Sequence, residues 1–185
     1  MSNPRIISGS AKGIRLRSVP GNSTRPITDR VKEALFNIIG ADIVGSSMLD
    51  LFSGTGSVGI EALSRGADYA RLLDLASAAI NTINYNLRLT HLNERADVIQ
   101  SNALVYLSKA ADRAFDYIYI APPQYKEIWS EALIALDRNA AWVGQDGWVI
   151  VQIHPVEFHT IDLWALDLFD QRRYGSTLLA FYRKQ

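Results

Sequence analysis

The sequence predicts an α/β protein with a mostly parallel seven-stranded sheet and a C-terminal β-hairpin. Short apolar runs alternate with stretches of helical spacing, which is typical of parallel strands joined by crossover helices. A glycine-rich turn follows the first apolar run and opens a helix, as in doubly wound sheets. The C-terminal end instead contains two β-rich segments separated by a short turn, which favours a hairpin.

The elements follow in order from the hydrophobic spacing. A helix is expected after Thr28, which can serve as its N-cap, and Gly40 is a plausible stop. Further helices are expected at 58–65, 77–89, 103–111 and 127–136. Strands are expected at 47–52, 70–74, 96–99, 115–120 and 147–153, and the hairpin at 161–172 and 177–183. Core positions are expected for the four tryptophans, Trp129, Trp142, Trp148 and Trp164. Trp129 is the one placed to touch a substrate.

Composition limits the class of protein. The 185 residues are 48% apolar and 21% charged, which suffices for one sizeable core. The chain contains no cysteine, and its three scattered histidines suggest no metal site. No apolar run approaches the roughly 20 residues that span a bilayer, and the N-terminus lacks a signal-peptide pattern. We therefore expect a cytoplasmic protein with neither a membrane nor a metal partner.

Basic side chains are concentrated at the N-terminus. Residues 1–33 carry seven basic and two acidic groups, a net charge of +5, so the rest of this zero-charge chain carries −5. A basic arm on an acidic body suits contact with a phosphate backbone, whereas a solvated basic surface is the alternative. We divide the chain into residues 1–40, a basic arm with its helix, and residues 41–185, one compact cofactor-binding unit.

The glycine-rich turn, Gly54-Thr55-Gly56-Ser57-Val58-Gly59, has the G-x-G-x-x-G spacing of a nucleotide-binding loop. Its glycines let the backbone approach a ligand, whose polar groups then meet amides at the helix N-terminus. Asp74 ends the next strand about twenty residues later, where a carboxylate can accept ribose hydroxyls. Capping the following helix is the alternative role for Asp74. These features fit a dinucleotide and S-adenosylmethionine equally well.

Asp50 favours one of these cofactors. An acidic residue just before the loop attracts a cationic amino group and repels a pyrophosphate. S-adenosylmethionine is therefore the expected cofactor, and a dinucleotide-binding oxidoreductase is the less favoured alternative.

A more specific resemblance is found at the end of the fourth predicted strand, Ala121-Pro122-Pro123-Gln124-Tyr125. The chain resembles, almost end to end, the bacterial small-subunit ribosomal RNA guanine-N2 methyltransferases, whose fourth strand ends in Asp/Asn-Pro-Pro-aromatic. The similar blocks are residues 5–9, 25–37, 50–56 and 172–175. The resemblance implies a Rossmann-like class I methyltransferase fold and direct methyl transfer to a guanine amino nitrogen, without a covalent enzyme intermediate.

The resemblance and the residue pattern together suggest a site. The implied partner is ribosomal RNA or the small-subunit particle, and the implied cofactor is S-adenosylmethionine. Its expected contacts are Asp50, Phe52, Ser53, Gly54, Thr55, Gly56, Asp74, Leu75, Asn102 and Ala103. Asn102 stands where the family usually has an aspartate facing the adenine. The expected RNA contacts are Arg5, Arg15, Arg17, Arg25, Thr28 and Arg30.

The candidate catalytic residues, Ala121, Pro122, Pro123, Gln124 and Tyr125, depart from the family pattern. The family's acidic or amide residue at the Ala121 position holds the exocyclic amino group, and its aromatic at the Gln124 position stacks on a flipped base. Losing a preorganised hydrogen-bond partner typically costs on the order of 100- to 1,000-fold in rate. Backbone carbonyls near Pro122, and the ring of Tyr125, are possible substitutes. The chain is thus an active enzyme with a variant site or, alternatively, a cofactor-binding and RNA-binding relative with little or no activity.

Overall fold

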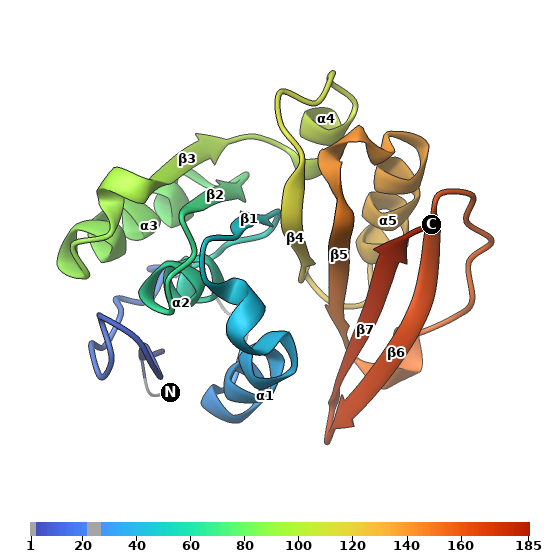
Figure 1. The fold of residues 1–185 in the computed structure, drawn as a ribbon. Helices are drawn as coiled ribbons and strands as arrows, with labels where there is room; N and C mark the ends of the chain where they lie inside the picture. The colour runs from blue at the N-terminus through green and yellow to red at the C-terminus, as the bar shows by residue number, and fades with distance from the viewer. Residues whose placement is uncertain (1–2, 22–26) are drawn as a thin grey trace.

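The computed structural model describes residues 3–21 and 27–185 (Figure 1). Within these residues, seven strands form one sheet in the order β3-β2-β1-β4-β5-β7-β6. β1 to β5 are parallel, β7 is antiparallel to β5, and β6 is antiparallel to β7. The strands are β1 (Ser47–Asp50), β2 (Tyr69–Asp74), β3 (Ala96–Gln100), β4 (Phe115–Ile120), β5 (Val143–Ile153), β6 (Leu166–Tyr174) and β7 (Thr177–Lys184). The predicted sheet and its closing hairpin are confirmed.

Helices cover both faces of the sheet (Figure 1). They are α1 (Asp29–Ile39), α2 (Ser57–Ser64), α3 (Ser77–Leu89), α4 (Ala103–Leu107) and α5 (Ile128–Arg138). Short 3-10 turns occur at Gly40–Ile43, Asn93–Arg95, Ala140–Trp142 and Pro155–Glu157. The predicted ends of α1 are confirmed: Thr28 accepts the Val31 amide at 3.3 Å, and Gly40 adopts a φ of 67° at the C-cap.

Successive side chains along a strand point to opposite faces of the sheet and pack into two separate hydrophobic cores. Tyr117 and Tyr119 of β4 pack with residues of α1, α2 and α3, whereas Ile118 and Ile120 pack with residues of α4 and α5. Because of this alternation, the position of a residue along β4 or β5 determines which face of the sheet its side chain lies on.

The N-terminal arm, residues 3–19, is docked on α2 and α3 through polar groups. The Glu61 carboxylate accepts the amides of Ile7 at 2.8 Å and Ser8 at 3.0 Å. It also forms ion pairs with Lys32 at 3.3 Å and Arg65 at 2.8 Å, and neither the Glu61 nor the Lys32 side chain is exposed. Burial lowers the pKa of Lys32, and the nearby Glu61 opposes that shift. The arm is thus fixed to the body by a carboxylate that is itself fully buried.

The predicted bounds of two elements were wrong because side chains distant in the sequence form hydrogen bonds with the backbone there. The strand expected at 161–172 begins at Leu166, since the Asp137 carboxylate accepts the amides of Trp164, Ala165 and Leu166 at 2.8–3.1 Å. The helix expected at 103–111 ends at Leu107, whose carbonyl accepts from the Asn139 and Trp142 side chains.

The start of β5 and one tryptophan also differ from expectation. β5 begins at Val143 rather than Gly147, and its pairing with β4 is irregular between Phe115 and Tyr117. Trp164 was predicted in the core but is 90% exposed, because it lies in the surface segment held by Asp137. Trp129 and Trp142 are buried as expected, and Trp148 packs against the first core.

Candidate functional site

A pocket of about 1290 Å³ lies at the carboxyl ends of the parallel strands, where the strand order reverses between β1 and β4. Ligands of doubly wound proteins bind at such switch points. The lining includes nine of the ten expected cofactor contacts: Asp50, Phe52, Ser53, Gly54, Thr55, Asp74, Leu75, Asn102 and Ala103. Gly56, the tenth, is the N-cap of α2 with a φ of 79°. A Cβ there would press on Ile60 and Leu72, so Gly56 shapes the turn from beneath.

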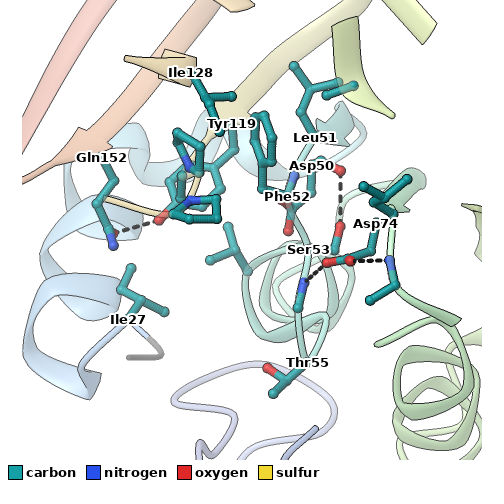
Figure 2. Close-up of a pocket in the computed structure, with 18 of the residues that line it drawn as sticks. Ile27, Asp50, Leu51, Phe52, Ser53, Thr55, Asp74, Tyr119, Ile128 and Gln152 are labelled. Carbon is teal, nitrogen blue, oxygen red and sulfur yellow. Dashed lines mark hydrogen bonds between the residues drawn. The ribbon is translucent and has the colours of Figure 1, made fainter. Parts of the chain in front are cut away.

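Asp74 fixes the loop after β1 by a hydrogen bond to the loop backbone (Figure 2). One Asp74 oxygen accepts the Gly54 amide at 2.9 Å, and the other accepts the Ala76 amide at 2.9 Å. A Cβ built on Gly54 meets no described atom within 4 Å, which is consistent with an open approach for a ligand. Asp74 therefore holds the loop, and it also lines the pocket.

Asp50 is the last residue of β1, directly before this loop, and it is only 1% exposed. Burial raises the pKa of its carboxyl to about 7; the Phe52 amide opposes the shift, and the nearby Asp74 adds to it. Among residues 3–21 and 27–185, no basic side chain forms an ion pair with Asp50. A ligand with a cationic group near Asp50 would favour the ionised carboxylate, so this site fits a positively charged amino acid moiety.

Asn102 caps α4 at the far side of the pocket. Its side-chain oxygen accepts the Leu104 amide at 2.9 Å and the Val105 amide at 3.2 Å. Because the oxygen is engaged, the group that Asn102 can offer a ligand is its amide nitrogen. Leu75, 64% exposed, provides an apolar surface at this end of the pocket.

The loop carrying residues 121–125 also lines the pocket. Tyr125 has a φ of 63° and its amide donates to Glu157 at 2.7 Å. Two residues further along the chain, the Glu127 carboxylate forms a hydrogen bond with the His159 ring at 3.0 Å. This hydrogen bond raises the pKa of His159. The tyrosine ring is 67% exposed and lies 6.0 Å from the His154 ring, so it is presented at the rim.

Residues 4–183 match the protein family described as conserved hypothetical protein 95. The chain belongs to that family. It is 40% identical over 184 residues to "Putative rRNA methyltransferase YlbH" of Bacillus subtilis, covering 98% of this chain and 99% of the relative. It is 32% identical over 148 residues to "Ribosomal RNA small subunit methyltransferase D" of Escherichia coli, covering 80% and 73%. The predicted resemblance is confirmed.

A solved structure gives the same result for the fold. "Putative methyltransferase yhhF from Escherichia coli" superposes with a TM-score of 0.87 at 29% identity, covering 98% of each chain. This member of the α/β class therefore has the Rossmann-like methyltransferase fold that the sequence predicted.

In this family member, the arm reaches the mouth of the pocket. Asn3, Ser18 and Val19 line it, together with Ile27, which is labelled in Figure 2. The arm is anchored beside the pocket because the Asn86 side chain bonds both backbone groups of Arg17, at 2.8 and 3.0 Å.

Most of the basic groups expected to contact RNA are exposed, either on this arm or in the first turn of α1. Arg15, Arg17 and Arg30 are exposed, and the Arg17 guanidinium lies 5.2 Å from the Tyr85 ring centre. Arg5 pairs with Asp29 at 2.7 Å while staying half-exposed, and Thr28 is exposed although it caps α1. Arg25 lies outside the described residues.

Sequence reasoning missed two residues that line the pocket near Ala121. The Tyr119 hydroxyl donates to the side-chain oxygen of Gln152 at 2.6 Å (Figure 2). The detectable signal was a polar residue, Gln152, inside the otherwise apolar end of β5. Trp129, by contrast, was wrongly placed near a substrate: it is 1% exposed and packs against Phe158 and His159 behind the pocket wall.

Clusters of potential metal ligands and membrane-spanning helices are both absent from the described residues. No group of three or more His, Asp or Glu side chains suitable for a metal ion occurs there. No helix in it is long and apolar enough to cross a membrane.

Proposed function

We propose that this protein is an S-adenosylmethionine-dependent methyltransferase that modifies a guanine N2 amino group of small-subunit ribosomal RNA. The observation that carries the proposal is the composition of the pocket, whose lining brings Asp50 and Asp74 together with the loop of residues 121–125. Relatives named as ribosomal RNA methyltransferases support the same substrate class. Such an enzyme is expected in the cytoplasm, where ribosomal subunits assemble.

The residues fit the cofactor along its length. Asp50 would hold the cationic amino acid end of the cofactor, Asp74 the ribose, and Asn102 with Leu75 the adenine; all four residues line the pocket. S-adenosylmethionine, when bound, supplies an activated methyl group. When ionised, the Asp50 carboxylate would attract a cationic amino group and repel a pyrophosphate, which supports S-adenosylmethionine over a dinucleotide.

The chain's own contribution to the reaction is mostly orientation. A base in structured RNA must be unstacked before its amino edge can enter the pocket, and the exposed Tyr125 ring can stack on it there. We assign residues 1–40 to RNA contact, with Arg15 and Arg17 facing phosphates, and residues 41–185 to cofactor binding and transfer. Orientation of this kind can supply a large part of a rate enhancement without a catalytic base.

Methyl transfer to RNA from a strain that lacks this gene tests the proposal. Small-subunit particles and purified ribosomal RNA from that strain are incubated with the protein and S-adenosylmethionine labelled in its methyl group. We expect label in a guanine N2 position of one of the two substrates. Absence of transfer to both, together with cofactor binding in calorimetry, would support the inactive relative. Binding of NAD but of neither S-adenosylmethionine nor its homocysteine product would favour the oxidoreductase.

A further inference from the structure

Gln152 of β5 lies beside Ala121, the position where the family pattern has an acidic or amide side chain. In the parallel pairing of β4 and β5, Tyr119 is opposite Ile150 and Ile120 is opposite Val151. Continuing that register by one residue brings Gln152 next to Ala121. Because side chains alternate along a strand, Tyr119, Ala121 and Gln152 all belong to the same face of the sheet, and all three line the pocket.

The orientation of the Gln152 side chain is set by Tyr119. The Tyr119 hydroxyl donates to the Gln152 side-chain oxygen at 2.6 Å, and the tyrosine is only 2% exposed. Burial raises the pKa of Tyr119 well above its usual value, with the nearby Asp50 adding to the shift, so the hydroxyl keeps its proton and remains a donor. A carbonyl oxygen has two lone pairs, which leaves a second acceptor position on Gln152.

We propose that the Gln152 amide oxygen accepts an N–H of the substrate's exocyclic amino group, in place of the side chain missing at Ala121. This inference rests on the proposed function and names the residue that orients the reacting nitrogen. Gln152 is the group that touches the substrate, whereas Tyr119 is a positioning residue. In the transfer, the nitrogen lone pair forms the bond to the methyl carbon, the carbon–sulfur bond electrons stay on sulfur, and one amino proton leaves to water.

The kinetic test removes this acceptor and then restores it from the neighbouring strand. Gln152→Leu should lower kcat about 10- to 100-fold while leaving the affinity for the homocysteine product of the cofactor within about two-fold. Ala121→Asn added to Gln152→Leu should recover most of the rate, since it places an amide on the adjacent strand. Tyr119→Phe should lower kcat less, because Gln152 remains present. Gln171→Leu, an exposed site on β6, is the matched control and should keep the parent rate.

A binding measurement on the mapped target provides a second readout, one that measures affinity instead of the rate of transfer. The nucleotide methylated by the parent is first mapped, and a short RNA containing it is made with guanine or with inosine, which lacks the amino group. With the homocysteine product bound, the parent should prefer guanine over inosine by about five-fold or more, and Gln152→Leu should lose that preference.

The possible outcomes separate the two proposals. Parent activity together with an unimpaired Gln152→Leu would overturn the role of Gln152 alone. A slow Gln152→Leu that Ala121→Asn fails to restore, with the guanine preference intact, would also overturn it, because the slower rate would then reflect packing. Absence of transfer by the parent to either particle or RNA would overturn the proposed function itself, and the role of Gln152 with it.

Discussion

Glu61→Gln tests how firmly the N-terminal arm is held to the body. Glu61 accepts hydrogen bonds from the amides of Ile7 and Ser8 and pairs with Lys32 and Arg65. Glutamine keeps the volume but removes the charge, leaving the fully buried Lys32 ammonium without its carboxylate. The new amide NH₂ also faces donors that the carboxylate accepted. We expect the free energy of unfolding to fall by about 3 to 5 kcal/mol.

Urea unfolding measures this decrease, and thermal unfolding should show a midpoint lowered by roughly 6 to 20 °C for a chain of this size. Asp170→Asn is the control, because it breaks an exposed ion pair with Arg172 at 2.9 Å and should cost less than about 1 kcal/mol. Lys32→Met should cost less than Glu61→Gln, since Glu61 would keep Arg65 and both amides.

An unfolding free energy for Glu61→Gln within about 1 kcal/mol of the parent would refute the argument that this carboxylate anchors the arm. If the argument holds, a loosened arm should also weaken RNA binding by the folded variant, whereas cofactor affinity should stay near the parent value. An equal decrease in cofactor affinity would show instead that the substitution disturbs the whole of α2.

Three further predictions concern the ligands. Cofactor affinity should rise as pH increases from about 6 to about 7.5, because a cationic ligand needs Asp50 ionised and its pKa is raised to about 7; calorimetry should detect proton release, and Asp50→Asn should abolish the pH dependence. Asp74→Ala should weaken cofactor binding by about 1 to 3 kcal/mol in equilibrium dialysis, and an unchanged affinity would limit Asp74 to holding Gly54. Replacing Arg15 and Arg17 by alanine should reduce RNA affinity and lower the log–log salt slope by nearly one unit for each phosphate that the arm no longer neutralises, whereas equal slopes would contradict the arm assignment.

The types of the elements along the chain, and the parallel direction of most strands, could be predicted because hydrophobic periodicity and the alternation of strands with helices indicate them. The alternation in β4 and the helical spacing of α1 are visible within a few residues of sequence. Element ends were less predictable where a distant side chain decides them. The Asp137 carboxylate accepts hydrogen bonds from the backbone amides of residues 164–166, and the Asn139 side chain donates to the Leu107 carbonyl at the end of α4. Neither interaction can be detected from the local hydrophobic pattern.

The same distinction applies to the site. Asp50, Gly54 and Asp74 line the pocket, and they could be predicted as candidate site residues because they are spaced within one strand–loop–helix–strand unit. Tyr119 and Gln152 come from different strands and meet only through the register of β4 with β5, which the sequence does not specify. Residues joined through sheet register are therefore the ones that this kind of sequence analysis misses.

α2 contacts the N-terminal arm along its length and begins directly after the loop that follows β1. Its first residue, Ser57, follows the cofactor loop and accepts a hydrogen bond from Lys32 at 2.8 Å. Lys32 also donates to the Arg5 carbonyl at 2.6 Å, and Glu61 in the same helix holds the next residues of the arm. At the last residue, Ser64, the close approach of the arm requires Gly9, with a φ of 85°, because a Cβ there would overlap the Ser64 carbonyl. One eight-residue helix thus fixes the arm relative to the loop, and a reaction that depends on orientation requires such a fixed relation.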